Sequence, residues 1–356
     1  MTKLTLLIGL LIGLTACDKT ADSFSLLPES NTYTQSSSYA PRKIDILWVV
    51  DNSGSMATSQ NNLATNFSSF INRFQENNYD FHMAVASTDA WEKKFNSNST
   101  KSRIRDGGLV SISPTNVTTH SGVFVMDPTT VGLTSTFITN ITLGVYGNGD
   151  ERAFESIRQT LNDTWNSSFR RTDAFLSVII VSDEDDFSHS TNSLNESYNN
   201  AGLSPVSDYV TYLDTLTNSK PGSAKNYSVN AIAIWDNTCR ATLTANDSFG
   251  GRKIATRYGQ LADATSGIKA SLCSNFGTSL QIITDSILEL SNTFKLNRVP
   301  VESTIRILVN GASVSQSSSN GWTYDSTTNS IVFHGAAVPP ADASIVINFD
   351  PATVKE

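Results

Sequence analysis

The run from Ile44 to Val50 is mainly apolar and β-branched, and it ends abruptly at Asp51. A strand covered on both faces has no solvent-facing side, so such a run predicts a central strand of a parallel sheet. Asp51, Ser53 and Ser55 follow at alternate positions. A tight turn there would point one carboxylate and two hydroxyl groups the same way, at the end of the strand where doubly wound sheets bind ligands.

Carboxylate and hydroxyl oxygens are the donors that a hard cation prefers. Mg²⁺ takes about six oxygen ligands at roughly 2.0 to 2.1 Å and usually retains some water, so a few protein oxygens are enough. Mn²⁺ accepts a similar donor set. The alternative is a strand followed by a polar turn that binds nothing, because short motifs also arise by chance.

Two later segments carry acidic residues at comparable places. Glu151 follows a glycine-rich loop and begins a helical pattern, and Asp183 follows a second apolar run, Phe175 to Val181. Between these segments strands alternate with amphipathic helices, which predicts a doubly wound, Rossmann-like α/β fold with a mainly parallel sheet. The cleanest apolar stripe belongs to the last helix and contains Leu280, Ile283, Ile287, Leu290 and Phe294.

These three segments, in this order, resemble the von Willebrand factor type A domain with a metal ion-dependent adhesion site (MIDAS). The resemblance covers about residues 42–296. It implies that Asp51, Ser53 and Ser55 bind a divalent cation, and that Asp183 reaches the cation directly or through water. The family binds acidic groups of partner proteins at such a site.

In many domains of this family a threonine occupies the place where Glu151 stands. The run Glu-x-x-Phe-x-x-Ile from Glu151 to Ile157 resembles integrin β subunit inserted domains, in which a glutamate binds the ion. A second anionic ligand would strengthen the attraction for a cation and lower the positive charge left for an acidic partner. The alternative role of Glu151 is a carboxylate in the first turn of a helix, where it favours the helix dipole.

The chain departs from the integrin β pattern after the last metal serine. Those domains have paired aspartates there, whereas this chain has Met56 to Gln60, so we expect no adjacent regulatory calcium site. Glu184, Asp185 and Asp186 extend the acidic run after Asp183. They could hold a second ion, Ca²⁺, although an exposed acidic run is more often only a solvated loop.

The first residues, 1–17, have the pattern of a bacterial lipoprotein signal peptide. Lys3 precedes a short apolar run, and Leu14-Thr15-Ala16-Cys17 resembles a lipobox, in which the cysteine becomes the lipidated first residue. The alternative is an ordinary secretory signal with a chance cysteine. Either way we expect an exported, envelope-localised protein, with a membrane anchor at Cys17 and with the leaflet undecided.

The rest of the chain divides into three further parts. Residues 18–41 are rich in Ser, Thr and Asn and predict a flexible tether, and residues 42–297 form the α/β domain, with a long polar insertion at about 88–142. From residue 299 to 356 apolar residues alternate, and Asn310-Gly311 indicates a hairpin, which predicts a small all-β module that packs on the main domain.

Charge and cysteine content fit an exported protein. The net charge of −8 argues against nucleic acid as a partner. With Cys17 assigned to lipid, Cys239 and Cys273 remain, and in an oxidising compartment they most simply form a disulfide. Two free buried thiols are the alternative.

We expect a binding protein and not an enzyme. The histidines at 82, 120, 189 and 334 are dispersed, and no Ser/His/Asp or Cys/His arrangement and no Lys or Arg phosphate clamp can be seen. The expected activity is metal-dependent capture of an Asp or Glu carboxylate on a protein partner. A role in envelope assembly, with a fixed neighbouring subunit in the same site, is the main alternative, and a metal-dependent hydrolase is a distant third.

Overall fold

The computed structural model describes residues 33–38, 43–76, 79–112, 115–219, 225–247, 249–291, 293–340 and 343–352. The expected signal peptide, with Cys17, lies outside these ranges. Within them, no helix is both long and apolar enough to cross a bilayer.

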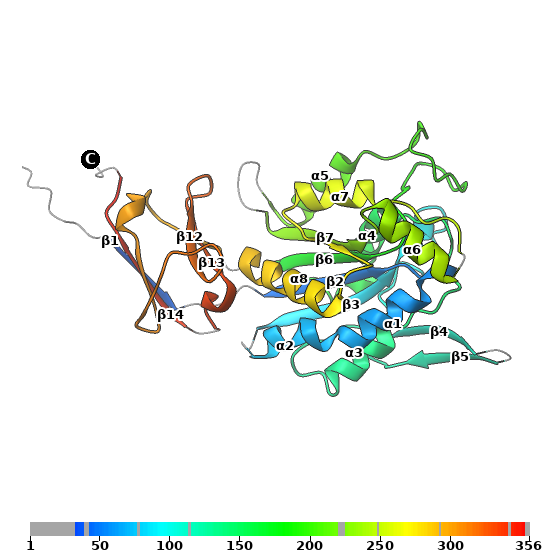
Figure 1. Ribbon diagram of the computed structural model, residues 1–356, viewed down its shortest axis with the longest axis horizontal. Helices are drawn as coiled ribbons and strands as arrows, with labels where there is room; N and C mark the ends of the chain where they lie inside the picture. Colours follow the sequence, from blue (N-terminus) through cyan, green and yellow to red (C-terminus); the bar gives the residue numbers. More distant parts are fainter. Residues whose placement is uncertain are drawn as a thin grey trace, which may run out of the picture.

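Five parallel strands form the central sheet, in the order β3-β2-β6-β7-β8 (Figure 1). Their bounds are β2 Ile44–Val50, β3 Phe81–Ser87, β6 Phe175–Val181, β7 Tyr227–Ala233 and β8 Lys269–Ser271. Strand β2 lies between β3 and β6, and all of its residues are buried. The expected doubly wound, Rossmann-like α/β fold with a parallel sheet is confirmed.

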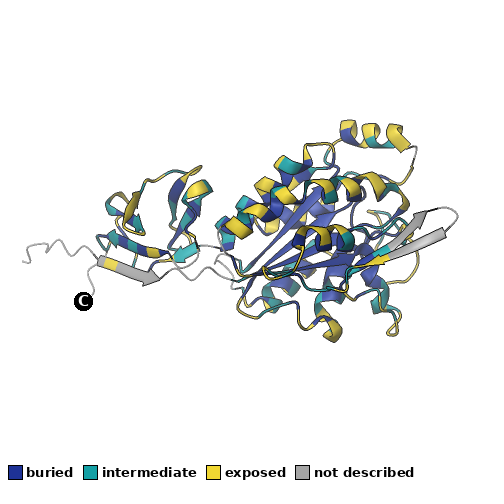
Figure 2. Ribbon diagram, turned by 90° about the horizontal axis from the view of Figure 1, so that it is seen from below, coloured by how far each residue is buried: buried dark blue, intermediate teal, exposed yellow. Residues whose placement is uncertain are grey.

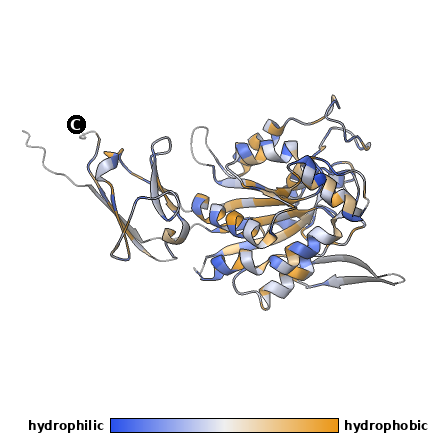
Figure 3. Cartoon of the chain, in the orientation of Figure 1, coloured by the Kyte–Doolittle hydropathy of each residue, from blue (hydrophilic) through white to orange (hydrophobic). Residues whose placement is uncertain are grey.

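Helices cover both faces of the sheet because the side chains of β2 alternate between two cores. Trp48 and Val50 belong to one core, and Leu47 and Val49 belong to the other. Figure 2 shows the strands as the most deeply buried part of the molecule, and Figure 3 shows that they are also its most apolar part. The first core is closed by α1 (Ala57–Asn66), α2 (Ser68–Glu76), α3 (Leu133–Ile141) and α8 (Phe276–Ser291). The second is closed by α4 (Ala153–Asn162), α5 (Val206–Leu216) and α7 (Thr256–Ala264).

The segment expected as a polar insertion has more structure than its composition suggests. It contains a short 3₁₀ helix (Thr88–Lys94), a hairpin of β4 (Gly107–Ile112) and β5 (Thr115–His120), and helix α3. Phe137 of α3 is buried and stacks on Phe67, which places this helix in the domain core. Leu133, Phe137 and Ile141 recur at helical spacing and are all buried, although the segment around this helix is polar in composition.

The C-terminal module consists of two small antiparallel sheets, β1-β14-β10-β11 and β12-β13-β9. The strands are β1 (Tyr33–Ser38), β9 (Thr293–Lys295), β10 (Arg306–Val309), β11 (Ala312–Val314), β12 (Gly321–Asp325), β13 (Ser330–His334) and β14 (Ser344–Phe349). The last helix is therefore shorter than its apolar stripe suggested. It ends at Ser291, and Phe294 lies in β9 opposite Ile331.

The expected flexible tether is wrong for Tyr33–Ser38, which form strand β1. This strand pairs antiparallel with β14, from Tyr33 opposite Phe349 to Ser38 opposite Ser344. Such pairing uses backbone hydrogen bonds, which leave no periodic apolar pattern in an edge strand. The small module is thus assembled from segments that precede and follow the α/β domain in the sequence.

The module packs against the main domain, as expected, near α2 and α8. Arg73 donates to the Gly335 carbonyl at 3.3 Å, and Glu289 accepts from the Gly335 N–H at 3.3 Å. The Tyr79 hydroxyl, just before β3, donates to the Pro339 carbonyl at 3.4 Å. These contacts involve the amino end of the strands, so the module lies opposite the end that carries Asp51 (Figure 1).

Candidate metal centre

Asp51 is the first residue after β2, and its carboxylate is held on both sides. One oxygen accepts the Ser53 backbone N–H at 2.7 Å, which closes a tight turn, and the other accepts the Ser182 hydroxyl at 2.8 Å. Ser182 follows β6, the neighbouring strand in the sheet. Asp51 is fully buried, so this side chain is fixed where the ends of two central strands meet.

The two serines of the turn connect Asp51 to Asp183. The Ser53 and Ser55 hydroxyl oxygens lie 3.3 Å apart, and the Ser55 hydroxyl donates to Asp183 Oδ1 at 2.9 Å. Asp183 follows β6 and is almost fully buried. The parallel register of β2 and β6 therefore brings together residues that are far apart in the sequence.

Glu151 lies in the loop before α4, and its side chain is fully buried. Neither carboxylate oxygen makes a well-formed hydrogen bond to any residue in the described ranges. Burial, followed by the negative charge of Asp51, raises the pKa of Glu151 well above its usual value, while the nearby Thr88 hydroxyl acts in the opposite direction. A buried carboxylate without partners is costly and needs a proton or a cation.

Asp51 is in a similar electrostatic situation. Burial, followed by the charge of Asp183, raises its pKa to about 7. Glu184 extends the acidic cluster, since burial and the charges of Glu196 and Asp51 raise its pKa to about 9. These side chains repel one another when ionised, so together they favour an added positive charge.

Cations of the protein reach only part of this cluster. Arg252 pairs with Asp183 at 2.7 Å, and Lys253 lies 3.5 Å from Glu184. No ion pair of the described residues involves Asp51 or Glu151. The two innermost carboxylates therefore lack the positive partner that buried charges normally have.

The donor set fits Mg²⁺ or Mn²⁺ better than a soft metal. In the part of the chain that the structure describes, no three His, Cys, Asp or Glu side chains converge closely enough to hold a metal by themselves. The candidate centre thus depends on the hydroxyl groups of Ser53 and Ser55 as well as on carboxylates. Such all-oxygen sites suit hard cations, which also keep water ligands.

The loop of Glu151 is tied to the Asp51 turn through its backbone. The Gly147 N–H donates to the Asn52 carbonyl at 2.7 Å, and a Cβ at Gly147 would lie 2.4 Å from the Asn52 side chain. Asp89 connects the Glu151 loop to the Asp51 turn, since it accepts hydrogen bonds from the Asn52 side-chain amide at 3.2 Å and from the Asn148 backbone N–H at 2.8 Å. Asp89 lies in the segment expected as an insertion, and its sequence context gave no sign of this role.

Asp185 and Asp186 have a different role from both roles expected for them. Asp185 accepts the N–H groups of Arg257 and Tyr258 at the start of α7, at 3.0 and 3.2 Å. Asp186 accepts the Phe154 N–H at the start of α4 at 2.9 Å and pairs with Arg257 at 3.1 Å. Both are fully buried, so they are neither a solvated loop nor free ligands for Ca²⁺. They cap two helices that flank the site.

His189, which follows the acidic run, is also buried. Its ring nitrogens lie 2.7 Å from the Phe187 carbonyl oxygen and 2.8 Å from the Ser193 carbonyl oxygen.

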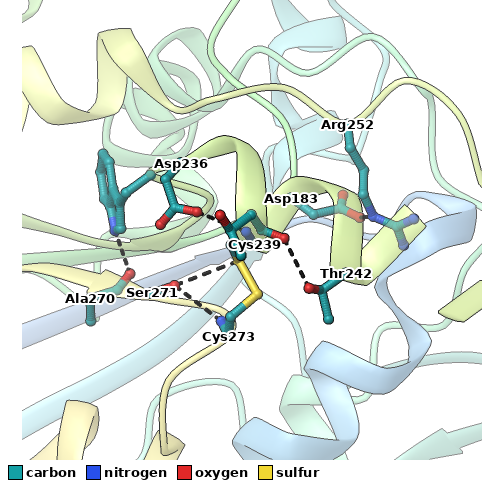
Figure 4. Close-up of a disulfide and its surroundings, with 10 residues drawn as sticks. Asp183, Asp236, Cys239, Thr242, Arg252, Ala270, Ser271 and Cys273 are labelled. Carbon is teal, nitrogen blue, oxygen red and sulfur yellow. Dashed lines mark hydrogen bonds and ion pairs between the residues drawn. A yellow bond between two sulfur atoms is a disulfide. The ribbon is translucent and has the colours of Figure 1, made fainter. Parts of the chain in front are cut away.

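One side chain that the sequence did not suggest, Arg252, lies directly against Asp183 (Figure 4).

Cys239 and Cys273 form a disulfide, as expected. Cys239 lies in the first turn of α6 (Asn237–Asp247), and Cys273 follows β8. Figure 4 shows the disulfide and the Asp183–Arg252 pair in the same view. The disulfide therefore attaches α6 to the edge of the sheet near the candidate centre.

No family model and no curated protein matches the sequence. Among solved structures, the chain is similar to the open conformation of the pilus adhesin SpaC from Lactobacillus rhamnosus GG, with 14% identity over 87% of this chain and 38% of that chain and a TM-score of 0.39. For the pilus adhesin RrgA from Streptococcus pneumoniae the identity is 10%, over 89% of this chain and 57% of that chain, with a TM-score of 0.34.

A third similar structure is proximal thread matrix protein 1 from the mussel byssus, with a zinc-occupied MIDAS motif. Its identity is 11%, over 74% of this chain and 52% of that chain, with a TM-score of 0.36. The chain spans less than two thirds of each of these three proteins. These values are too low to transfer a function, and the fold assignment rests on the strand order and helix layers described above.

Proposed function

We propose that this chain is a membrane-anchored binding protein of the bacterial cell envelope that uses Mg²⁺ or Mn²⁺ to bind a carboxylate of a protein partner. The observation that carries the proposal is the pair of buried carboxylates, Asp51 and Glu151, without a cationic partner among the described residues. The cation would be held by Asp51, Ser53, Ser55, Glu151 and Asp183. When bound, it supplies a coordination position at which an acidic side chain replaces water.

The residues of the chain prepare this position before a cation arrives. The Ser53 N–H and the Ser182 hydroxyl fix both oxygens of Asp51, and the Ser55 hydroxyl fixes Asp183. These bonds keep the donors oriented, so little ordering remains to be done on binding.

Aromatic residues border the turn and would help to select the partner. Phe249 lies against Gly54, where an added Cβ would be 3.2 Å from the ring, and this phenylalanine is 47% exposed. Tyr146 directly precedes Gly147, whose N–H binds the Asn52 carbonyl, and it is 60% exposed. We expect a partner whose acidic residue is flanked by apolar side chains, because exposed aromatic groups beside a polar anchor are typical of protein interfaces.

Calorimetry with Mg²⁺, Mn²⁺ and Ca²⁺ tests the metal site on the purified full-length chain. The comparison is with a double variant, Asp51→Ala with Ser53→Ala, and with Asp263→Asn, an exposed aspartate that pairs with Lys269 at the surface. We expect one saturable site in the wild type and in Asp263→Asn, and none in the double variant. Equal binding in all three proteins would contradict the proposal.

The anchor is tested separately at Cys17. The Cys17→Ser variant is expected to move from the membrane fraction to the soluble envelope fraction, and mass spectrometry of the wild type is expected to find lipid on that cysteine. An unmodified Cys17 within the mature chain would contradict anchoring and leave the metal site unaffected.

A further inference from the structure

Arg252 places a fixed positive charge at the edge of the candidate metal centre. Its Nε atom donates to Asp183 Oδ2 at 2.7 Å, while the other oxygen of Asp183 accepts the Ser55 hydroxyl (Figure 4). The Arg252 and Asp183 side chains are only 3% and 2% exposed, so water screens this pair weakly. Arg252 is therefore not a candidate metal ligand itself, but it directly contacts one, Asp183.

The guanidinium group is held rigidly from its other side. Nη1 and Nη2 donate to the two carboxylate oxygens of Asp247 at 2.7 and 2.6 Å, and Nη1 also donates to the Phe249 carbonyl at 3.2 Å. A bidentate pair of this kind fixes the plane of the guanidinium. Arg252 thus cannot swing away from Asp183 without breaking several hydrogen bonds.

Helix α6 provides the support for this clamp. Asp247 is its last residue, and its first turn is fixed by the Cys239–Cys273 disulfide and by the Cys239 N–H bond to Asp236 at 2.8 Å. None of these contacts involves a metal ligand. The position of Arg252 is accordingly set by the fold and does not depend on a bound cation.

The charges at the candidate centre explain why a fixed positive charge at Arg252 is useful. Asp51, Glu151 and Asp183 together with a divalent cation carry a net charge of minus one, which repels an acidic partner. The Arg252 guanidinium makes the centre neutral. Asp247 compensates Arg252 only in part, because its side chain is 31% exposed and its charge is solvated. The presence of Glu151, where a neutral threonine would leave more positive charge, makes this compensation necessary.

We propose that Arg252 is a charge-compensating residue of the metal centre: it weakens the binding of the cation and strengthens the binding of a carboxylate to the loaded centre. The inference rests on the proposed function and names a residue that adjusts it. A purely structural role predicts the opposite for the metal, because loss of a residue that only orients Asp183 would weaken metal binding.

Mn²⁺ and acetate are suitable probes, because the relaxation of water protons reports both Mn²⁺ binding and the displacement of its water by a carboxylate. We expect Arg252→Gln to bind Mn²⁺ about tenfold more tightly and to need about tenfold more acetate for the same displacement, as expected for removal of one nearby charge. Arg252→Lys keeps the charge but not the bidentate pair with Asp247, so its values are expected to lie between those of the wild type and those of Arg252→Gln. Arg240→Gln, which changes an exposed arginine on α6, is expected to behave like the wild type.

A second variant keeps the test decisive if Arg252→Gln folds poorly. Asp247→Asn removes a negative charge and leaves Arg252 in place, so it is expected to weaken Mn²⁺ binding and to lower the acetate concentration required. The inference would be overturned if folded Arg252→Gln bound Mn²⁺ no more tightly than the wild type, or if Asp247→Asn bound Mn²⁺ as tightly as the wild type. Either result would leave the proposed metal site unaffected. Absence of Mn²⁺ binding in the wild type would overturn the proposed function and this inference with it.

Discussion

The Ser55 hydroxyl donates a 2.9 Å hydrogen bond to Asp183, which is 128 residues further along the chain. The bond is possible because β2 and β6 are neighbours in parallel register, so the loops at their carboxyl ends meet. Those loops bring two further carboxylates, Asp51 and Glu184, into the same buried region. Several measurable properties follow from this concentration of negative charge.

Metal affinity is expected to rise with pH. The pKa of Asp51 is raised to about 7, so at pH 6 most of this carboxyl group is protonated in the metal-free protein, and a cation must displace the proton. We expect Mg²⁺ binding to strengthen several-fold between pH 6 and pH 8, with protons released. Calorimetry in buffers of different ionisation enthalpy measures that release, and no release at pH 6.5 would contradict the assignment.

The stability of the metal-free protein is expected to change with pH in the opposite direction. Because the pKa of Asp51 is about 7 in the folded chain and near 3.8 in the unfolded chain, the folded state holds the proton more tightly. Stability from this group therefore falls as pH rises from about 4 to about 7. Urea unfolding with and without Mg²⁺ tests this, and we expect the cation to stabilise the protein more at pH 8 than at pH 6.

Asp51→Asn is expected to separate stability from metal binding. The amide removes a buried charge, so the metal-free variant at pH 8 is expected to be more stable than the wild type by about 1 to 2 kcal/mol. It is also expected to lose the stabilisation by Mg²⁺. A metal-free variant less stable than the wild type would show that the carboxylate is already compensated within the protein.

Asp186→Asn is expected to have the reverse profile. Asp186 caps α4 and pairs with Arg257, and breaking a buried pair of this kind costs about 3 kcal/mol. Because both contacts are structural, the number of Ca²⁺ or Mg²⁺ ions bound per folded chain is expected to stay the same. Loss of one bound Ca²⁺ in this variant would instead support a second ion site at the acidic run.

Removal of the disulfide is expected to destabilise the domain. The double variant Cys239→Ser with Cys273→Ser opens a loop whose ends are 34 residues apart, and the loss is expected to be about 2 to 4 kcal/mol. Chemical unfolding of wild type and variant, each with and without a reductant, measures this difference. The variant is expected to be insensitive to the reductant, which serves as its internal control.

The sequence was most informative where burial leaves a pattern. The apolar runs at Ile44–Val50 and Phe175–Val181 predicted strands that are fully buried, and the acidic residues after them lie at adjoining strand ends. Strand β1 could not be recognised from the sequence, because it pairs with β14 through backbone hydrogen bonds, which leave no periodic pattern of apolar side chains. The helix-capping roles of Asp185 and Asp186 depend on helix ends that are close only in the folded chain.

Arg252 was missed for a related reason. It stands near glycines in a polar stretch between two helices, and no spacing relates it to Asp183. Its place beside the loops of the candidate metal centre depends on where α6 ends and on the disulfide that anchors this helix. Long-range positions of this kind require the tertiary structure.

The route of the backbone from β1 to Asp51 has a mechanical consequence. The chain passes from β1 in the small module directly to β2, the strand that ends at the candidate centre. If a captured partner and the segment before Tyr33 were pulled apart, tension would run along β2 to Asp51. Strand β2 is bonded along its length to β3 and β6, so the load would shear two rows of hydrogen bonds at once and would not peel them apart one by one.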